Sequence, residues 1–191
     1  VNPLTVASTD VPFDAAGKRL AYDAGGVDIE GVVRLKDGTY WLSDENAPGI
    51  LHIAADGRVL KRFVPAGTEK DFKDAQYDIA ATLPAILAKR QGNRGIESIA
   101  MSPDEQFLYF LVQNPLANPD NATYRDASNT RLFKMERASG KVIGEYVYVL
   151  DDPKFYKAKS QSSVRISEMS ALGTDRLLAL ALDPGRHRVV P

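Results

Sequence analysis

One arrangement of residues occurs three times along this chain of 191 residues. Each copy has a short apolar strand with an acidic residue near its start, then a tight turn and a second apolar strand. The copies lie at 29–45, 96–113 and 166–182. In the first two copies a strand–turn–strand hairpin follows, so the unit reads as four consecutive antiparallel strands. This repeat constrains the fold more than composition does, because each copy is expected to form the same structure.

A repeated four-stranded antiparallel unit predicts an all-β protein of the β-propeller type. The predicted blade units are about 29–65, 96–150 and 166–182, and residues 183–191 form an atypical tail rich in Pro, Gly and Arg. This amounts to about two and a half blades, whereas propellers usually need at least four to close. We therefore expect 1–191 to be a partial domain whose partners include the missing blades. The alternative is a β-sandwich whose turns coincide with this pattern.

The units begin about 70 residues apart, although ordinary blades run roughly 40–50 residues. The extra length lies in three connections, 66–94, 114–130 and 151–165. In an antiparallel meander, the first strand starts at the same end of the sheet at which the second strand finishes. The insertions should therefore emerge as long loops on one face, opposite the tight turns, and loops of this kind often carry function. One short helix is predicted within the first connection, at 83–90.

Composition excludes several classes of function. Lys and Arg total 24 against 25 Asp and Glu, and this balance argues against nucleic acid or an anionic membrane surface as a partner. The absence of cysteine excludes thiolate metal sites and cysteine nucleophiles. The sequence contains neither an apolar stretch of membrane-spanning length nor a signal peptide at Val1–Leu4. Without a phosphate-binding glycine loop, we expect no organic cofactor.

Acidic and amide side chains collect at the end of the unit from which the insertions emerge. Convergent carboxylates favour a hard cation, calcium above all. They could instead act as acid and base on a substrate, because neighbouring carboxylates move each other's pKa values apart. A third interpretation is that each Glu only accepts backbone N–H groups. The side chains concerned are Glu30, Asp44, Glu45, Glu97, Gln113, Asn114 and Glu168.

Three arginines, Arg94, Arg125 and Arg131, lie on or near the same predicted face. Guanidinium groups bind phosphate and carboxylate oxygens in a bidentate manner, so these residues could hold an anionic substrate. The alternative is that they form surface ion pairs. Both interpretations remain open at the level of sequence.

Further motifs lie in and around the repeat, at 28–45, 93–116 and 131–168. The most specific of them contains Asn93-Arg94-Gly95-Ile96-Glu97-Ser98. Together they resemble the bacterial phytase-like family that is described as having esterase-like activity of phytase. The resemblance extends over roughly residues 28–180. Ser98 departs from the family pattern, in which a glycine allows close packing, and the tail at 183–191 departs as well.

The resemblance implies an exported protein, periplasmic or secreted, that hydrolyses phosphate or carboxylic esters. By analogy with β-propeller phytases, calcium would bind the substrate and activate water, arginines would hold the anion, and a carboxylate would orient the water. Gln113 is carried over from the family together with two sets of residues. The metal set is Glu30, Asp44, Glu45, Glu97 and Glu168, and the catalytic set is Glu97, Arg94, Asn114 and Arg131.

Two other functions fit the same sequence, so whether the protein is an enzyme stays open. One is a non-catalytic propeller that binds a peptide or glycan on its loop face, where 114–130 is polar and contains proline. The other is a lactonase similar to the gluconolactonases, which would need Glu, Asn and Asp ligands from different blades. Acids outnumber aromatic residues on the predicted loop face, and this favours metal binding or catalysis.

Overall fold

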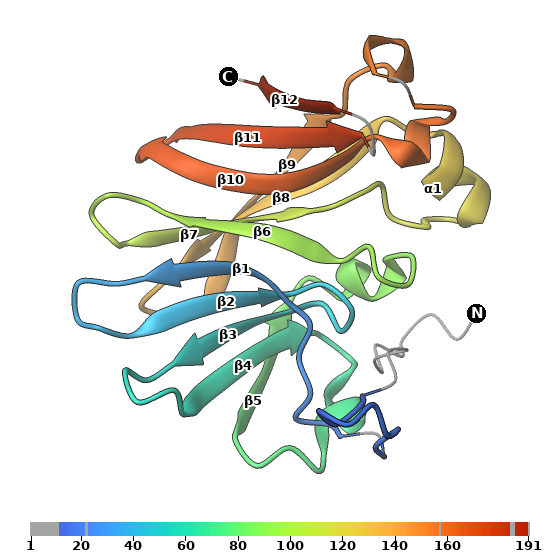
Figure 1. Ribbon diagram of the computed structural model, residues 1–191. Coiled ribbons are helices and arrows are strands. Elements are labelled where there is room, and N and C mark those ends of the chain that lie inside the picture. The colour runs from blue at the N-terminus through green and yellow to red at the C-terminus, as the bar shows by residue number, and fades with distance from the viewer. Residues whose placement is uncertain (1–11, 22, 157, 184–185, 191) are drawn as a thin grey trace.

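The computed structural model describes residues 12–21, 23–156, 158–183 and 186–190, and it shows three β-sheets that follow one another along the chain (Figure 1). The first sheet contains β1 (Ile29–Arg34), β2 (Tyr40–Asp44), β3 (Gly49–Ile53), β4 (Val59–Pro65) and β5 (Asp78–Leu83). The second contains β6 (Ile96–Met101), β7 (Phe107–Val112), β8 (Asn129–Glu136) and β9 (Lys141–Val149). The third contains β10 (Arg165–Gly173), β11 (Arg176–Asp183) and β12 (Arg186–Val190).

The inner strands of the second sheet are buried on both faces, as the alternation of side chains along β7 shows. Leu108, Phe110 and Val112 pack into a core shared with the first sheet. Tyr109 and Leu111 point the other way, into a core shared with the third sheet. Because successive side chains of a strand face opposite sides, a strand between two cores must be apolar throughout. This explains the uninterrupted apolar run of β7.

The prediction of an all-β propeller of about two and a half blades, with long loops on one face, is confirmed. Two of the sheets differ from the expected four-stranded antiparallel unit. The first sheet has a fifth strand, β5, which runs parallel to β4 and pairs Lys61 with Asp78. The third sheet has a third strand, β12, within the range 183–191 that we expected to depart from the blade pattern. A strand pairs through its backbone, so the unusual composition of this range does not prevent it from joining β11.

The short helix expected in a connection is present, but it lies elsewhere in the chain. Among the described residues, α1 (Asn121–Asp126) in the second connection is the single α-helix. The helix predicted at 83–90 is found only as a shorter 3₁₀-helix, because Leu83 ends β5 and pairs with Pro65. Pro84 then has an extended backbone, and only the 3₁₀-helix η2 (Ala85–Lys89) follows.

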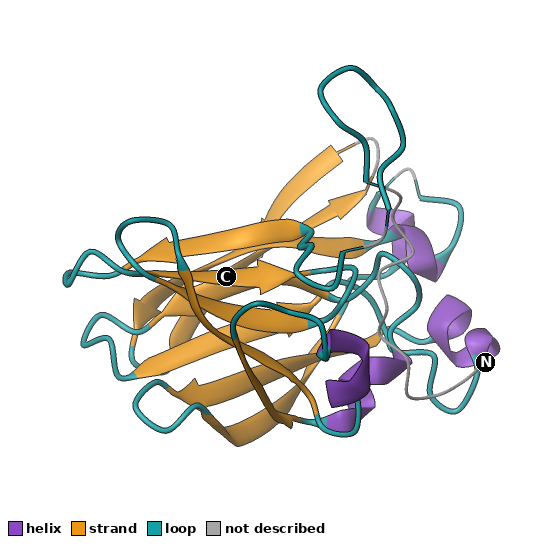
Figure 2. Ribbon diagram, turned by 90° about the horizontal axis from the view of Figure 1, so that it is seen from below, coloured by secondary structure: helices purple, strands orange, loops and turns teal. Residues whose placement is uncertain are grey.

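The helical turns gather at one end of the strands, and the tight turns of the β1–β2, β3–β4, β6–β7, β8–β9 and β10–β11 hairpins lie at the other (Figure 2). The remaining 3₁₀-helices are η1 (Glu69–Phe72), η3 (Pro153–Phe155) and η4 (Gln161–Ser163). All of them belong to the three long connections. Within the part of the chain that is described, no helix has the length and apolar character needed to cross a membrane.

Gly95, just before β6, lies in close contact with the first sheet. A Cβ at this position would overlap the carbonyl oxygen of Glu45 and would lie 3.1 Å from Cγ of Pro48. The N–H of Gln113 donates to the carbonyl of Gly95 at 2.9 Å, so the glycine is also tied to the end of β7. Backbone atoms that are held on both sides cannot move aside for an added methyl group.

We therefore predict that Gly95→Ala lowers the free energy of unfolding by about 3 kcal/mol, as overpacking against backbone does. Urea denaturation followed by circular dichroism measures the change. Gly173→Ala is the matched control, because a Cβ there would lie 3.8 Å from the nearest atom, Cβ of Arg176. Equal stability of the two variants would contradict the close approach.

Candidate functional site

A β-bulge re-aims the side chain near the start of the first strand in every sheet. The pairing register shifts between Ile29 and Gly31, between Ile96 and Ser98, and between Ile166 and Glu168. The extra residue at the bulge is therefore Glu30, Glu97 or Ser167, respectively. Bulges commonly turn a side chain away from the regular alternation of the strand. Glu168 falls one position later, where the other sheets have Gly31 and Ser98.

In the first two sheets, the residue just after the second strand also makes an equivalent backbone hydrogen bond. Glu45 donates its backbone N–H to the carbonyl of Asp28 at 3.0 Å. Gln113 makes the equivalent bond to Gly95 at 2.9 Å. These bonds extend each strand pair by one step, and they bring Glu45 beside the residues that precede β1.

Three carboxylates meet at this end of the first sheet. Asp28, Glu30 and Glu45 each offer one oxygen, and these oxygens all lie within 4.8 Å of one another. Glu45 is almost fully buried, whereas Asp28 is half-buried and Glu30 is exposed. We call these three residues the carboxylate cluster. The sequence pattern indicated Glu30 and Glu45 but not Asp28, although Asp28 begins the motif at 28–45 just before the strand.

Glu97 comes from the second sheet and lies against the cluster. Its Oε2 accepts a hydrogen bond from Nε2 of Gln113. The pKa of Glu97 is raised to about 8, mainly by burial and also by the nearby carboxylates of Glu45 and Glu30. Both effects favour the uncharged acid, and the hydrogen bond from Gln113 opposes them only in part. In the cation-free protein, the protonated form of Glu97 is therefore favoured at neutral pH.

Glu45 is the most buried member of the carboxylate cluster, with 2% of its surface exposed. Burial raises its pKa to about 6, against the lowering effect of the Arg94 guanidinium. Nη1 of Arg94 lies 3.7 Å from Oε1 of Glu45, and that oxygen has no hydrogen-bond partner. Oε1 of the buried Gln113 has none either. A buried oxygen of the cluster and a buried oxygen on Gln113, the hydrogen-bond partner of Glu97, thus accept no hydrogen bond.

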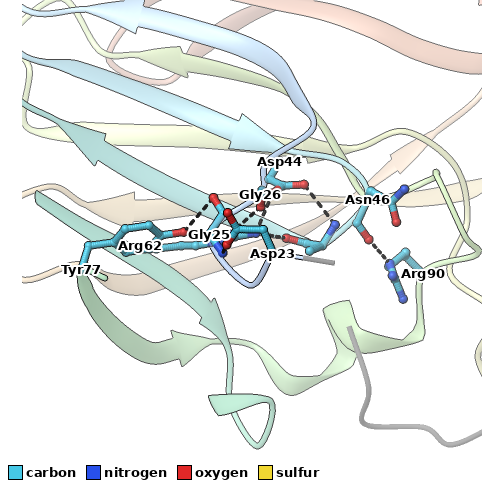
Figure 3. Close-up of polar contacts among 9 residues, drawn as sticks. Asp23, Gly25, Gly26, Asp44, Asn46, Arg62, Tyr77 and Arg90 are labelled. Carbon is cyan, nitrogen blue, oxygen red and sulfur yellow. Dashed lines mark hydrogen bonds and ion pairs between the residues drawn. The ribbon is translucent and has the colours of Figure 1, made fainter. Parts of the chain in front are cut away.

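Asp44 does not join the carboxylate cluster. Its Oδ2 accepts a hydrogen bond from Nη2 of Arg62 at 2.6 Å, and both side chains are buried (Figure 3). Its Oδ1 accepts the backbone N–H of Ala47 at 3.0 Å. Burial raises the pKa of Asp44 to about 6 despite the opposing effect of Arg62, so the pair is ionised at neutral pH. Asp44 therefore holds the turn after β2 in place.

The other predicted residues have different surroundings. Asn114 is buried, and its Nδ2 donates to the carbonyl of Val164 at 3.0 Å, which ties the second sheet to the chain entering the third. Arg131 forms an ion pair with Glu145 on the neighbouring strand β9. Glu168 is exposed, and its carboxylate accepts the N–H of Met169 at 2.8 Å.

The departure at Ser98 also has a structural consequence. Ser98 is fully buried, and its Oγ has no hydrogen-bond partner. The equivalent residue in the first sheet is Gly31, where a Cβ would lie 2.7 Å from Oγ of Ser43. Close packing at this position therefore requires glycine in the first sheet but admits a serine in the second.

The family model described as phytase-like, esterase-like activity of phytase, matches residues 3–184. An uncharacterized secreted protein of Arthroderma benhamiae is 26% identical over 192 residues. That match covers 91% of this chain and 36% of the relative, so the chain spans about a third of the length of the curated relative that it matches.

Solved structures with a similar arrangement include the β-propeller domain of Cps50 (Swd1) from Myceliophteria thermophila, with a TM-score of 0.42 and 9% identity. That match covers 87% of this chain and 40% of the other. A protein of unknown function from Bacteroides caccae has a TM-score of 0.44 and 12% identity, covering 90% of this chain and 48% of the other.

The raised pKa of Glu97 predicts how stability varies with pH. The folded protein holds a proton on Glu97 up to about pH 8, whereas the unfolded chain releases it near the ordinary value of 4.5. The unfolded state therefore binds fewer protons between these limits, and the free energy of unfolding of the cation-free protein falls as the pH rises. Asp44 and Glu45, raised to about 6, act in the same direction below pH 6.

Urea denaturation at several pH values measures this dependence. Glu97→Gln should flatten the fall, above all between pH 6 and 8. The lowered pKa of His52 acts in the opposite direction, so the difference between wild type and variant isolates the contribution of Glu97. Glu69→Gln, an exposed position on η1, is the control and should keep the wild-type slope. A slope that Glu97→Gln leaves unchanged would refute the protonated state of Glu97.

Proposed function

Because the chain belongs to the phytase-like family, we propose that it forms part of a metal-assisted hydrolase of phosphate or carboxylic esters. The observation that carries this proposal is the carboxylate cluster, whose oxygens lie within 4.8 Å of one another at the end of the sheets with the long connections. Like charges this close repel one another, and a bound divalent cation would relieve that repulsion.

The residues present fit a hard cation such as calcium. Asp28, Glu30 and Glu45 supply carboxylate oxygens, which calcium prefers as ligands. The buried Oε1 of Glu45 and that of Gln113 lack hydrogen-bond partners. When bound, the cation would act as a Lewis acid that polarises the P–O or C=O bond of a substrate.

Glu97 and Arg94 would act on the substrate beside the cluster. Burial raises the pKa of Glu97 to about 8 in the cation-free protein, so this side chain would be suited to donate a proton to the oxygen of the leaving group. Arg94 keeps about a quarter of its side chain exposed while it lies 3.7 Å from Glu45. Its remaining N–H groups would hold an anionic substrate against the cluster.

We further propose that additional blades of the same protein complete the ring. Ala179 and Ala181 of β11 face the second sheet, so the alternating residues Leu178, Leu180 and Leu182 face the other way. These leucines are only half-buried. A following blade would cover them as the third sheet covers the second. The similarity to a secreted protein supports export to the periplasm or the outside of the cell.

Calorimetric titration of the full-length protein with Ca²⁺ tests the cation site. We expect saturable binding by the wild type and a loss of at least tenfold in affinity for Glu45→Gln, because the amide removes a negative ligand. Glu69→Gln, an exposed position on η1, is the control and should bind as the wild type does. If the wild type gave no heat and no thermal stabilisation by Ca²⁺, the cation site would be wrong.

Hydrolysis of phenyl phosphate and phenyl acetate, whose leaving groups need a proton at neutral pH, tests the role of Glu97. Loss of a general acid typically costs about 10²- to 10⁴-fold in rate, so Glu97→Gln should lower kcat by about 100-fold or more. Calcium affinity of the variant, measured in parallel, separates a catalytic defect from a binding defect. Full turnover by Glu97→Gln on a substrate that the wild type hydrolyses would exclude the proposed role.

A further inference from the structure

Asp28 is the one ligand of the carboxylate cluster that precedes the strands of the first sheet. The loop before it turns at Asp23, whose Oδ1 accepts the N–H of Gly25 at 2.7 Å (Figure 3). The N–H of Gly26 donates to the carbonyl of Asp23 at 3.0 Å. These local bonds shape the turn, but they do not fix its distance from the rest of the sheet.

Arg62 of β4 connects this loop to the turn that carries Glu45. Its Nη1 donates to the carbonyl of Gly26 at 3.1 Å. Its Nη2 donates to Oδ2 of Asp44 at 2.6 Å and to the carbonyl of Ala47 at 3.2 Å. One buried guanidinium therefore contacts the chain two residues before Asp28 and on both sides of Glu45. The planar group has a fixed geometry, so it also fixes the separation of the two segments.

Tyr77, from the connection between β4 and β5, contacts both partners in this arrangement. Its hydroxyl accepts a hydrogen bond from Nη1 of Arg62 at 3.2 Å and donates to the carbonyl of Gly25 at 3.3 Å. The ring of Phe72, from the same connection, lies 4.5 Å from Cζ of Arg62. Arg90, which lies between β5 and β6 in the same long insertion at 66–94, donates to the carbonyl of Asn46 at 2.8 Å. The long insertion thus braces the two segments that bear the ligands.

We propose that Arg62 and Tyr77 are positioning residues that set the affinity of the carboxylate cluster for its cation. The proposal rests on the proposed cation site. Neither residue belongs to the cluster, and both act through the backbone of the Asp23–Gly26 turn. The charges of Asp28, Glu30 and Glu45 repel one another within 4.8 Å. The contacts of Arg62 and Tyr77 hold the loop before Asp28 against this repulsion, in addition to the bond between the N–H of Glu45 and the carbonyl of Asp28. Holding it in place before binding removes an ordering cost from the binding step.

Tyr77→Phe tests this proposal with the smallest change, since it removes only the hydroxyl. We expect the calcium affinity of the full-length protein, measured by calorimetry, to fall about fivefold, the equivalent of one net hydrogen bond. Tyr146→Phe on the exposed strand β9 is the matched control and should bind calcium as the wild type does. Circular dichroism in excess EDTA verifies that each variant is folded at the temperature of the titration.

Arg62→Lys provides a second test that keeps the charge opposite Asp44. The ammonium group cannot reach Asp44, Gly26 and Ala47 at once, so calcium affinity should fall again in a folded protein. If the wild type and both folded variants bound calcium equally, and Glu45→Gln did not, the positioning role of Arg62 and Tyr77 would be wrong while the cation site stood. If the wild type bound no calcium, both proposals would be overturned.

Discussion

The guanidinium of Arg62 and the carboxylate of Asp44 form an ion pair, with Nη2 and Oδ2 separated by 2.6 Å and both side chains out of contact with solvent. Transferring two such charges out of water costs several kcal/mol each, and attraction alone seldom recovers that cost. Here the carbonyl of Gly26 and the N–H of Ala47 add further hydrogen bonds. Removal of either charge would leave the other buried and unpaired. The segments around residues 26, 44 and 62 are therefore fixed together, and the carboxylate cluster is built on them.

The same bulged geometry occurs in all three sheets, but the residues placed on it differ. At the bulge, the first two sheets have Glu30 and Glu97, and the third has Ser167. The junction of the first two sheets therefore collects acidic side chains. The next junction is instead held by a neutral group, Asn114, which donates to the carbonyl of Val164. The same backbone geometry thus places acidic side chains at one junction and a neutral, hydrogen-bonding amide at the next.

The strands, the turns and the position of the loop face could be predicted because alternation and tight-turn residues are local signals. The assignment of the carboxylates was harder, since a bulge changes the register by one residue. Because of this shift, the bulge residue of the third sheet is Ser167, and Glu168 is exposed on β10. Asp44 looked like its neighbour Glu45 in sequence, but its partner, Arg62, comes from another strand. The contribution of Asp28 depends on the loop before β1, which carries no periodic signal.

The long connection after β4 shows why insertion length alone does not locate a binding site. The oxygens of the carboxylate cluster come from Asp28, Glu30 and Glu45, which lie next to or within the strands β1 and β2. The insertion supplies Tyr77 and Arg90, which contact backbone carbonyls behind the cluster. Glu97 reaches the cluster from the second sheet, at the place where Gly95 allows the two sheets to approach. The separation of the acid groups is therefore a property of how two blades stack, and any change in that stacking would alter the electrostatics of the site.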